Sequence, residues 1–191
     1  MFFRDKRGIS DERGVTLIEI LVVISIVMIL TGIVFINYRT GERQLILQRV
    51  AFKLAQDIRR AQEMAMSAKE CTHSVACPSG GIPSGGYGIY FDQTNPNQYI
   101  VYADTGSPWG RRNPSGGNED IEAIFFETGV RIRSVSPPQA SINFKPPDPT
   151  ISLKDNSGVD SDNVVITIEL TADTSKYKTI KVNKAGRIEV D

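Results

Sequence analysis

Residues 13–30 read RGVTLIEILVVISIVMIL, and this stretch decides the fold of the N-terminal part of the chain. The apolar run continues beyond it, and the 19 residues from Ile20 to Tyr38 carry no charge. A helix rises about 1.5 Å per residue, so about 20 apolar residues cross the roughly 30 Å hydrocarbon core of a membrane. We therefore expect a transmembrane helix over 15–38, a segment whose one charge is Glu19.

A buried helix of a globular protein and a secretory signal peptide are the alternatives for this run. The rest of the chain is too short to surround such a helix on every side and also build its own core. A signal peptide has a shorter apolar region, about 7 to 15 residues, followed by a small-x-small cleavage site. This run has neither property. Basic residues lie on both sides of it, so charge counting leaves its orientation open.

Glu19 is the unusual residue of the run. A carboxylate in an apolar helix is costly unless a cation pairs with it, which makes it a functional candidate. Alternatively, it lies at the membrane interface and reaches water, because it stands near the start of the segment.

The stretch 13–30 closely resembles the class III signal sequence of type IV pilins and type II secretion pseudopilins. The resemblance implies that Gly14 is the last residue of a leader that prepilin peptidase removes. Val15 then becomes the N-terminal residue and is methylated on its amine. Glu19 falls on the fifth mature position, where the family has a Glu. The family more often has Phe or Met where this chain has Val15.

The same resemblance implies the topology and the partners. A leader, residues 1–14, would lie in the cytoplasm, and the C-terminal part would lie outside the inner membrane. After cleavage, Glu19 would pair with the freed amine of a neighbouring subunit's Val15 and set the register between subunits. The implied partners are other pilin or pseudopilin subunits, prepilin peptidase, an inner-membrane assembly platform and, before assembly, membrane lipid.

A second, amphipathic helical segment is expected over 39–70. Apolar residues recur there three or four positions apart, at Leu47, Val50, Leu54, Ile58, Ala61, Ala65 and Ala68. The opposite face is mostly charged, so this stalk can lay one face on a sheet. Its string RVAFKLAQDIRRAQEMAMSA, residues 49–68, resembles the same segment of H-type minor pseudopilins.

Two cysteines follow in the string CTHSVAC, at Cys71 and Cys77. A disulfide that closes a small loop is the favoured interpretation for an exported domain. A metal site that includes His73 is the alternative, but it offers three ligands at most and lacks the paired spacing of zinc sites.

The region 71–191 is expected to be an extracytoplasmic, β-rich head. Short β-type runs separated by Gly, Pro and Asn predict antiparallel sheets over 88–91, 98–102, 121–126, 130–132, 141–144, 164–170, 179–182 and 187–190. The string FKPPDPTISL must be a loop or an edge strand, because proline cannot donate to a ladder. The first half of VVITIEL, residues 164–170, is expected to be buried on both faces. The predicted fold class is α+β, with a long N-terminal helix packed on an antiparallel β head.

The head shows no motif of a nucleotide site or a hydrolase, and the chain has one histidine, so no enzyme is predicted. No cofactor is expected beyond a structural Ca²⁺, such as some major pseudopilins hold near their C-terminal region. Its candidate ligands are Asp155, Asp160 and Asp162, although the EF-hand spacing fails. A solvated turn is the alternative for this acidic loop.

The chain has 22 basic and 22 acidic residues, and this zero net charge gives no indication of nucleic-acid binding. The balance hides a segregation of charge. Residues 39–69 carry seven basic and three acidic side chains, and residues 70–191 carry eleven and fifteen. The function predicted is a structural subunit, a pilin or pseudopilin in a minor role, that assembles through its N-terminal helix. A membrane-anchored binding protein or enzyme that does not polymerise is the alternative.

Overall fold

The structure, a computed structural model, describes residues 14–113, 118–146 and 150–191, without the side chains of 36–40 and 150. The chain forms two compact units, Met1–Glu42 and Arg43–Asp191. One helix, α1 (Leu17–Met66), contributes its first part to one unit and its second part to the other.

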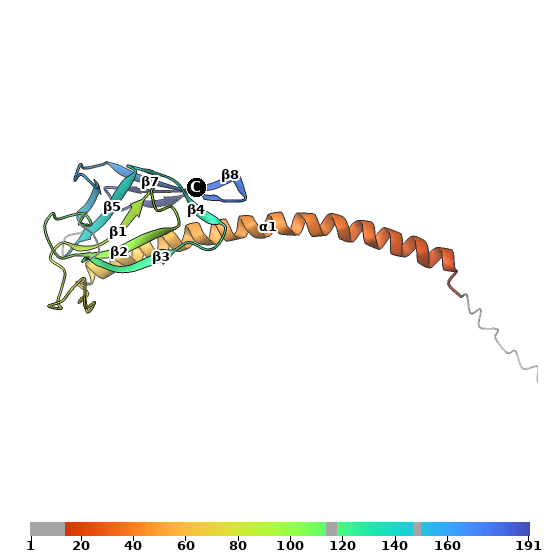
Figure 1. Ribbon diagram of the computed structural model, residues 1–191, viewed down its shortest axis with the longest axis horizontal. Coiled ribbons are helices and arrows are strands. Elements are labelled where there is room, and N and C mark those ends of the chain that lie inside the picture. Colours follow the sequence, from red (N-terminus) through yellow and green to blue (C-terminus); the bar gives the residue numbers. More distant parts are fainter. Residues whose placement is uncertain (1–13, 114–117, 147–149) are drawn as a thin grey trace, which may run out of the picture. The chain divides into compact units, whose positions relative to one another are not determined.

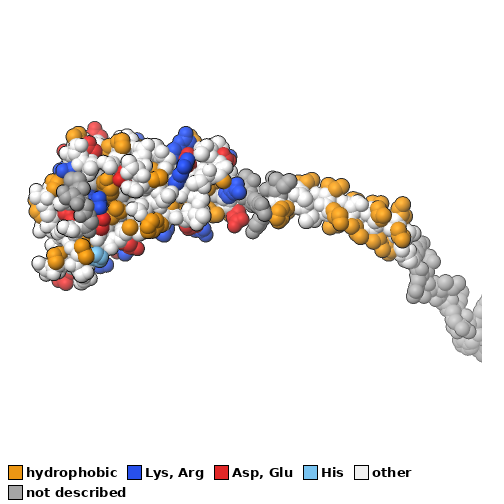
Figure 2. Space-filling view, viewed as in Figure 1, with side chains coloured by type: hydrophobic (Ala, Val, Ile, Leu, Met, Phe, Trp, Pro, Cys, Tyr) orange, Lys and Arg blue, Asp and Glu red, His pale blue; other side chains and the backbone are white. Residues whose placement is uncertain are grey.

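In the first unit, the start of α1 exposes apolar side chains on all sides. Leu17–Phe35 is long and apolar enough to cross a membrane, and none of this segment is buried. Figure 2 shows these hydrophobic side chains along the helix surface. Burying one large apolar side chain is worth about 1.5–3 kcal/mol, so this surface requires lipid or neighbouring helices rather than water.

In the second unit, the rest of α1 buries one face against the β-strands (Figure 1). The buried side chains recur with helical spacing: Leu47, Val50, Ala51, Leu54, Ile58, Ala61, Met64 and Ala65. The opposite face exposes Lys53, Arg59 and Glu63, together with Phe52. The predicted amphipathic face is confirmed, except that Ala68 lies beyond the end of the helix.

The helix ends at Met66, before the end of the predicted segment 39–70. Ala68 has a positive φ of 47°. The Lys69 N–H donates to the Met64 carbonyl at 3.0 Å, and the Ala68 N–H donates to the Ala65 carbonyl at 3.0 Å. These two bonds make a Schellman motif, in which a left-handed residue closes the helix and satisfies its last carbonyls.

Among the described residues of the second unit, nine strands form two antiparallel sheets. The five-stranded sheet has the order β3 (Asp120–Phe125), β2 (Gln98–Asp104), β1 (Gly86–Asp92), β5 (Gln139–Lys145), β6 (Thr150–Asp155). The four-stranded sheet has the order β4 (Val130–Ser136), β7 (Asn163–Leu170), β8 (Asp173–Asn183), β9 (Ile188–Val190). The predicted α+β class is therefore confirmed.

One strand agrees with its sequence expectation and another differs from it. The Pro-rich string was expected to be a loop or an edge, and β6 is the edge strand of its sheet, starting at Thr150. In β7 the expected order of burial was wrong: the strand alternates over its first half and is buried on both faces only at Glu169 and Leu170. Glu169 is buried because Arg131, its cross-strand neighbour on β4, lies 2.8 Å from its carboxylate.

One hydrophobic core joins α1 to both sheets. A polar link crosses it where the Tyr99 hydroxyl donates to the Asp57 carboxylate of α1. Burial, followed by this hydrogen bond, raises the pKa of Tyr99 far above its usual value. The tyrosine therefore stays neutral and keeps its role as a donor across the physiological range.

The left-handed Ala68 yields a first prediction. An L-residue pays about 1–2 kcal/mol in this conformation and glycine pays none, although glycine loses about 0.5–1 kcal/mol more in backbone entropy on folding. Ala68→Gly should therefore raise the free energy of unfolding by about 0.5–1 kcal/mol, measured by urea denaturation of the full chain in detergent. Gln56→Gly, at an exposed position inside α1, should lower it by about 1 kcal/mol. A loss of stability in Ala68→Gly would contradict the motif.

Candidate functional site

The start of α1 gathers the three residues that the sequence singled out, Gly14, Val15 and Glu19. The chain from Gly14 to Thr16 is not helical and is exposed, and the helix begins at Leu17. Among the described residues, no atom lies within 4 Å of the position that a Cβ on Gly14 would take. The peptide bond between Gly14 and Val15 is therefore open to another protein.

Thr16 caps the helix. Its side-chain hydroxyl accepts the Glu19 N–H at 3.3 Å, and its carbonyl accepts the N–H groups of Glu19 at 3.1 Å and Ile20 at 3.2 Å. The pattern Thr-x-x-Glu is a capping-box sequence, in which the first residue satisfies a free N–H of the first turn. The cap uses only the backbone N–H of Glu19, so the Glu19 carboxylate remains available for other interactions.

The Glu19 side chain is exposed in the first turn of the helix. Within the described part of the chain, no cation lies within ion-pair distance of it. The helix dipole favours an acid at this end, by about 0.3–1 kcal/mol. That is far less than the cost of a charge in lipid, so a Glu19 carboxylate buried there would require a compensating cation.

A sequence-family comparison bears on this segment. The family described as the prokaryotic N-terminal methylation motif matches residues 9–35. This match supports a type IV pilin-like prepilin signal in this segment. The matched range contains Gly14, Val15 and Glu19, and it ends where the membrane-spanning candidate Leu17–Phe35 ends. No curated protein and no solved structure matches the chain.

The prepilin motif implies processing by prepilin peptidase and assembly with other pilins. The rest of the predicted leader, residues 1–13, lies outside the described residues. The apolar helix that follows is compatible with a single-pass inner-membrane anchor.

In the second unit, Cys71 and Cys77 form a disulfide with Cα atoms 5.8 Å apart. Both residues are buried in the core. The Cys71 N–H donates to the Gly81 carbonyl at 2.8 Å. The disulfide loop therefore joins the end of α1 to the segment that leads into β1.

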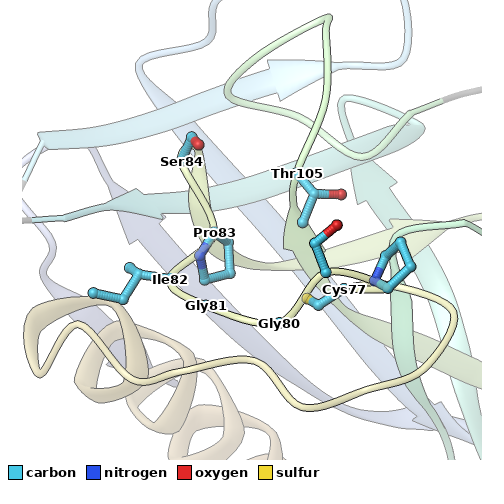
Figure 3. A pocket seen from close by; sticks show the side chains of 9 residues that line it. Cys77, Gly80, Gly81, Ile82, Pro83, Ser84 and Thr105 are labelled. Carbon is cyan, nitrogen blue, oxygen red and sulfur yellow. The ribbon is translucent and has the colours of Figure 1, made fainter.

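A cavity of about 280 Å³ lies beside the disulfide (Figure 3). It is lined by Cys77, Pro78, Ser79, Gly80, Gly81, Ile82, Pro83, Ser84 and Thr105. None of these side chains titrates near neutral pH, since Cys77 is oxidised. The cavity therefore offers hydroxyl and backbone groups but no acid–base pair.

The predicted calcium ligands are engaged in other contacts. The Asp155 carboxylate accepts the N–H groups of Ser157 at 2.9 Å and Val159 at 2.8 Å. Asp162 pairs with Lys184 at 3.1 Å. Across the residues that the structure describes, no group of three or more His, Cys, Asp or Glu could hold a metal ion. The calcium site on Asp155, Asp160 and Asp162 stays a prediction without geometric support.

Sequence reasoning missed the buried carboxylates of the head, Asp104, Glu119 and Glu169. Each stands in an ordinary polar setting in the sequence, so nothing in its immediate neighbours marks it. The one available signal in the sequence was Gly85, which directly precedes β1. A glycine in a strand often marks a close approach of another group, and a Cβ on Gly85 would lie 2.2 Å from the Asp104 carboxyl carbon.

The disulfide yields a second prediction. Closing a loop with a sequence separation of 6 stabilises the head by about 2 kcal/mol through the unfolded chain. The double variant Cys71→Ala with Cys77→Ala should lose at least that much free energy of unfolding, measured by urea denaturation of the full chain in detergent. A reducing agent should lower the urea midpoint of the wild type but leave the double variant unchanged. Equal midpoints for wild type and variant would show that the disulfide carries no stability.

Proposed function

We propose that this chain is a structural subunit, a pilin or pseudopilin in a minor role, of a type IV pilus-like or type II secretion pseudopilus filament. The observation that carries the proposal is the methylation motif over residues 9–35 with Glu19 inside an otherwise apolar helix. An ordinary membrane anchor requires neither the motif nor an acid at this position.

Maturation is the first step of the proposed function. Prepilin peptidase cleaves after Gly14 on the cytoplasmic side, and Val15 is methylated on its new amine. The exposed, non-helical backbone from Gly14 to Thr16 supports this step, because a protease must hold its substrate in an extended form. The methylated amine of Val15 remains a cation.

Assembly is the second step. In a filament, the Glu19 carboxylate pairs with the Val15 amine of a neighbouring subunit. This pair offsets the desolvation of both charges and places one subunit at a fixed axial distance from the next. On assembly, the apolar surface of Leu17–Phe35 leaves lipid and packs against neighbouring helices. Its Ile and Val side chains therefore stay in an apolar environment before and after assembly.

The proposed location follows from the same scheme. The precursor spans the inner membrane once, with the leader in the cytoplasm and the head outside, and the assembly platform then draws it into the filament. The Cys71–Cys77 disulfide supports an extracytoplasmic head, because disulfides persist in oxidising compartments. The likeness of residues 49–68 to H-type minor pseudopilins supports the minor role.

Intact-mass measurement of the chain purified from membranes of the producing cell tests the first step. We expect loss of residues 1–14 and addition of one methyl group. The same measurement after Gly14→Leu should return the full-length, unmethylated chain, because a large side chain at this position hinders the peptidase. An uncut wild-type chain would instead support a membrane-anchored protein that does not polymerise.

Substitution of Glu19 tests the second step. Glu19→Gln keeps the size of the side chain and the backbone cap from Thr16 but removes the charge. We expect normal cleavage and membrane insertion, with incorporation into sheared filaments reduced at least tenfold. Ser25→Ala is the matched control, because the Ser25 hydroxyl donates to the Leu21 carbonyl of its own helix and should be dispensable. Wild-type incorporation of Glu19→Gln would refute the pairing.

A further inference from the structure

Residues 105–113, which we call the strap, cross one face of the five-stranded sheet. A Cβ on Gly110 of the strap would lie 2.8 Å from the Ser152 hydroxyl of β6. The Lys154 ammonium donates to the Trp109 carbonyl at 3.3 Å. The Arg112 N–H donates to the Ser141 hydroxyl of β5 at 3.2 Å. The strap thus covers β5 and β6 from outside the hydrophobic core.

Two buried carboxylates hold the strap by its backbone. The Gly110 N–H donates to Asp104 Oδ2 at 2.6 Å. Glu119 accepts the N–H of Gly106 at 3.2 Å through Oε1 and that of Asn113 at 2.7 Å through Oε2. Asp104 is completely buried, and Glu119 is 4% exposed. The middle and both ends of the strap therefore depend on these two acids.

A row of unsatisfied polar atoms lies on the same sheet face. In the described part of the chain, the buried side-chain atoms without a hydrogen-bond partner are Tyr102 Oη, Asp104 Oδ1, Asn143 Oδ1 and Ser152 Oγ. Tyr102, Gly88, Asn143 and Ser152 are successive cross-strand neighbours from β2 to β6. Asp104 lies two residues further along β2 and faces the same way.

An ionised Asp104 leaves this arrangement short of donors. Its Oδ2 accepts the Gly110 N–H and, at 3.3 Å, the Asn143 amide N–H, but its Oδ1 accepts nothing. A buried polar atom without a partner costs about 1–3 kcal/mol, and a buried charge costs more. A proton on Oδ1 removes the charge and supplies a donor to a region where Asn143 Oδ1 lacks one.

The charges around Asp104 act in both directions. The pKa of Asp104 is raised to about 7, with burial as the largest cause and the Glu119 carboxylate acting in the same direction. The Gly110 N–H, Lys154 of β6 and Lys145 of β5 act against this rise. The pKa of Glu119 is also raised by burial, against the hydrogen bonds from the strap backbone. A proton is therefore retained on Asp104 under conditions in which an exposed aspartate has lost it.

The remaining groups near Asp104 do not compete for this proton. Tyr102 of β2 stays neutral because burial raises its pKa well above 10. Arg112 of the strap is held by Asp120 of β3, at 2.6 Å between Nε and Oδ1. From the turn before β1, the close neighbour of Asp104 is Gly85, which carries no side chain.

We propose that the strap is a pH-sensitive cover, which is closed while Asp104 carries a proton and opens as that carboxyl ionises. Opening admits water to Asp104 and to the row of Tyr102, Asn143 and Ser152. It also changes the surface that the head presents around Trp109, which is exposed and is the chain's only tryptophan. This device belongs to the head and does not depend on the prepilin motif.

The sign of the effect follows from proton linkage. Asp104 binds its proton more tightly under the closed strap than in water, where an aspartate titrates near 4. The equilibrium constant for opening should therefore be constant below about pH 4 and rise about tenfold per pH unit up to about pH 7. It should level off above that, because Asp104 is then ionised in both states. The total rise is on the order of a hundredfold to a thousandfold.

Hydrogen exchange of the Gly110 amide in the full chain, in detergent, measures this opening equilibrium directly. After division by the intrinsic exchange rate, the wild type should show the rise between pH 4 and pH 7 and the levelling above it. Asp104→Asn mimics the protonated acid, since its amide can donate and its oxygen can accept the Gly110 N–H. This variant should stay closed, and the rise of its opening constant over the same range should be at least tenfold smaller than in the wild type, because only Glu119 then contributes.

Two further variants make the test specific. His73→Gln removes the chain's only histidine, which lies outside the strap, and should keep the wild-type profile. Lys154→Met removes a cation that lowers the pKa of Asp104, so the levelling should move to higher pH, and this variant serves even if Asp104→Asn fails to fold. A flat wild-type profile, a rise of wild-type size in Asp104→Asn, or an unmoved profile in Lys154→Met would each overturn the proposal.

Discussion

The structure depends on a change of environment along one continuous helix. Over Leu17–Phe35, α1 is apolar on all sides and buries nothing within its own unit. From Leu47 onward it is apolar on one face, and that face forms the core with two sheets. No proline interrupts the helix. The first part of α1 is therefore suited to lipid or neighbouring helices, and its second part packs on the head. The pattern of apolar residues, rather than helix propensity, separates the two parts.

The end of α1 is set by local hydrogen bonds and a disulfide, and not by the pattern of apolar residues. Ala68 takes a left-handed conformation, and the backbone bonds around it satisfy the last carbonyls of the helix. The disulfide from Cys71 to Cys77 then binds the following loop to the core. These short-range restraints fix where the chain leaves the helix, and they therefore fix where β1 can begin.

The sequence predicted those features that arise from periodicity and from chain stiffness. The apolar run, the amphipathic face and most strands follow from the spacing of apolar residues. The sequence did not predict the burial of Glu169, because the compensating Arg131 is distant in the chain and reaches it only through the pairing of β4 with β7. Asp104 and Glu119 were not predicted for a related reason: they accept hydrogen bonds from backbone N–H groups of the strap, and such backbone partners cannot be recognised in a sequence.

Residues that their own fold does not require are informative about function. Gly14 has open space around it, and the Glu19 carboxylate forms no ion pair with the described residues, whereas the Thr16 side chain caps the helix. The described structure supplies no packing reason for a glycine at one position or an acid at the other. Asp104 is the opposite case, because Gly85 leaves room for its carboxyl group and Gly110 donates to it. The proposed cleavage and assembly with other proteins would account for Gly14 and Glu19. The contacts of Asp104, in contrast, lie within the head.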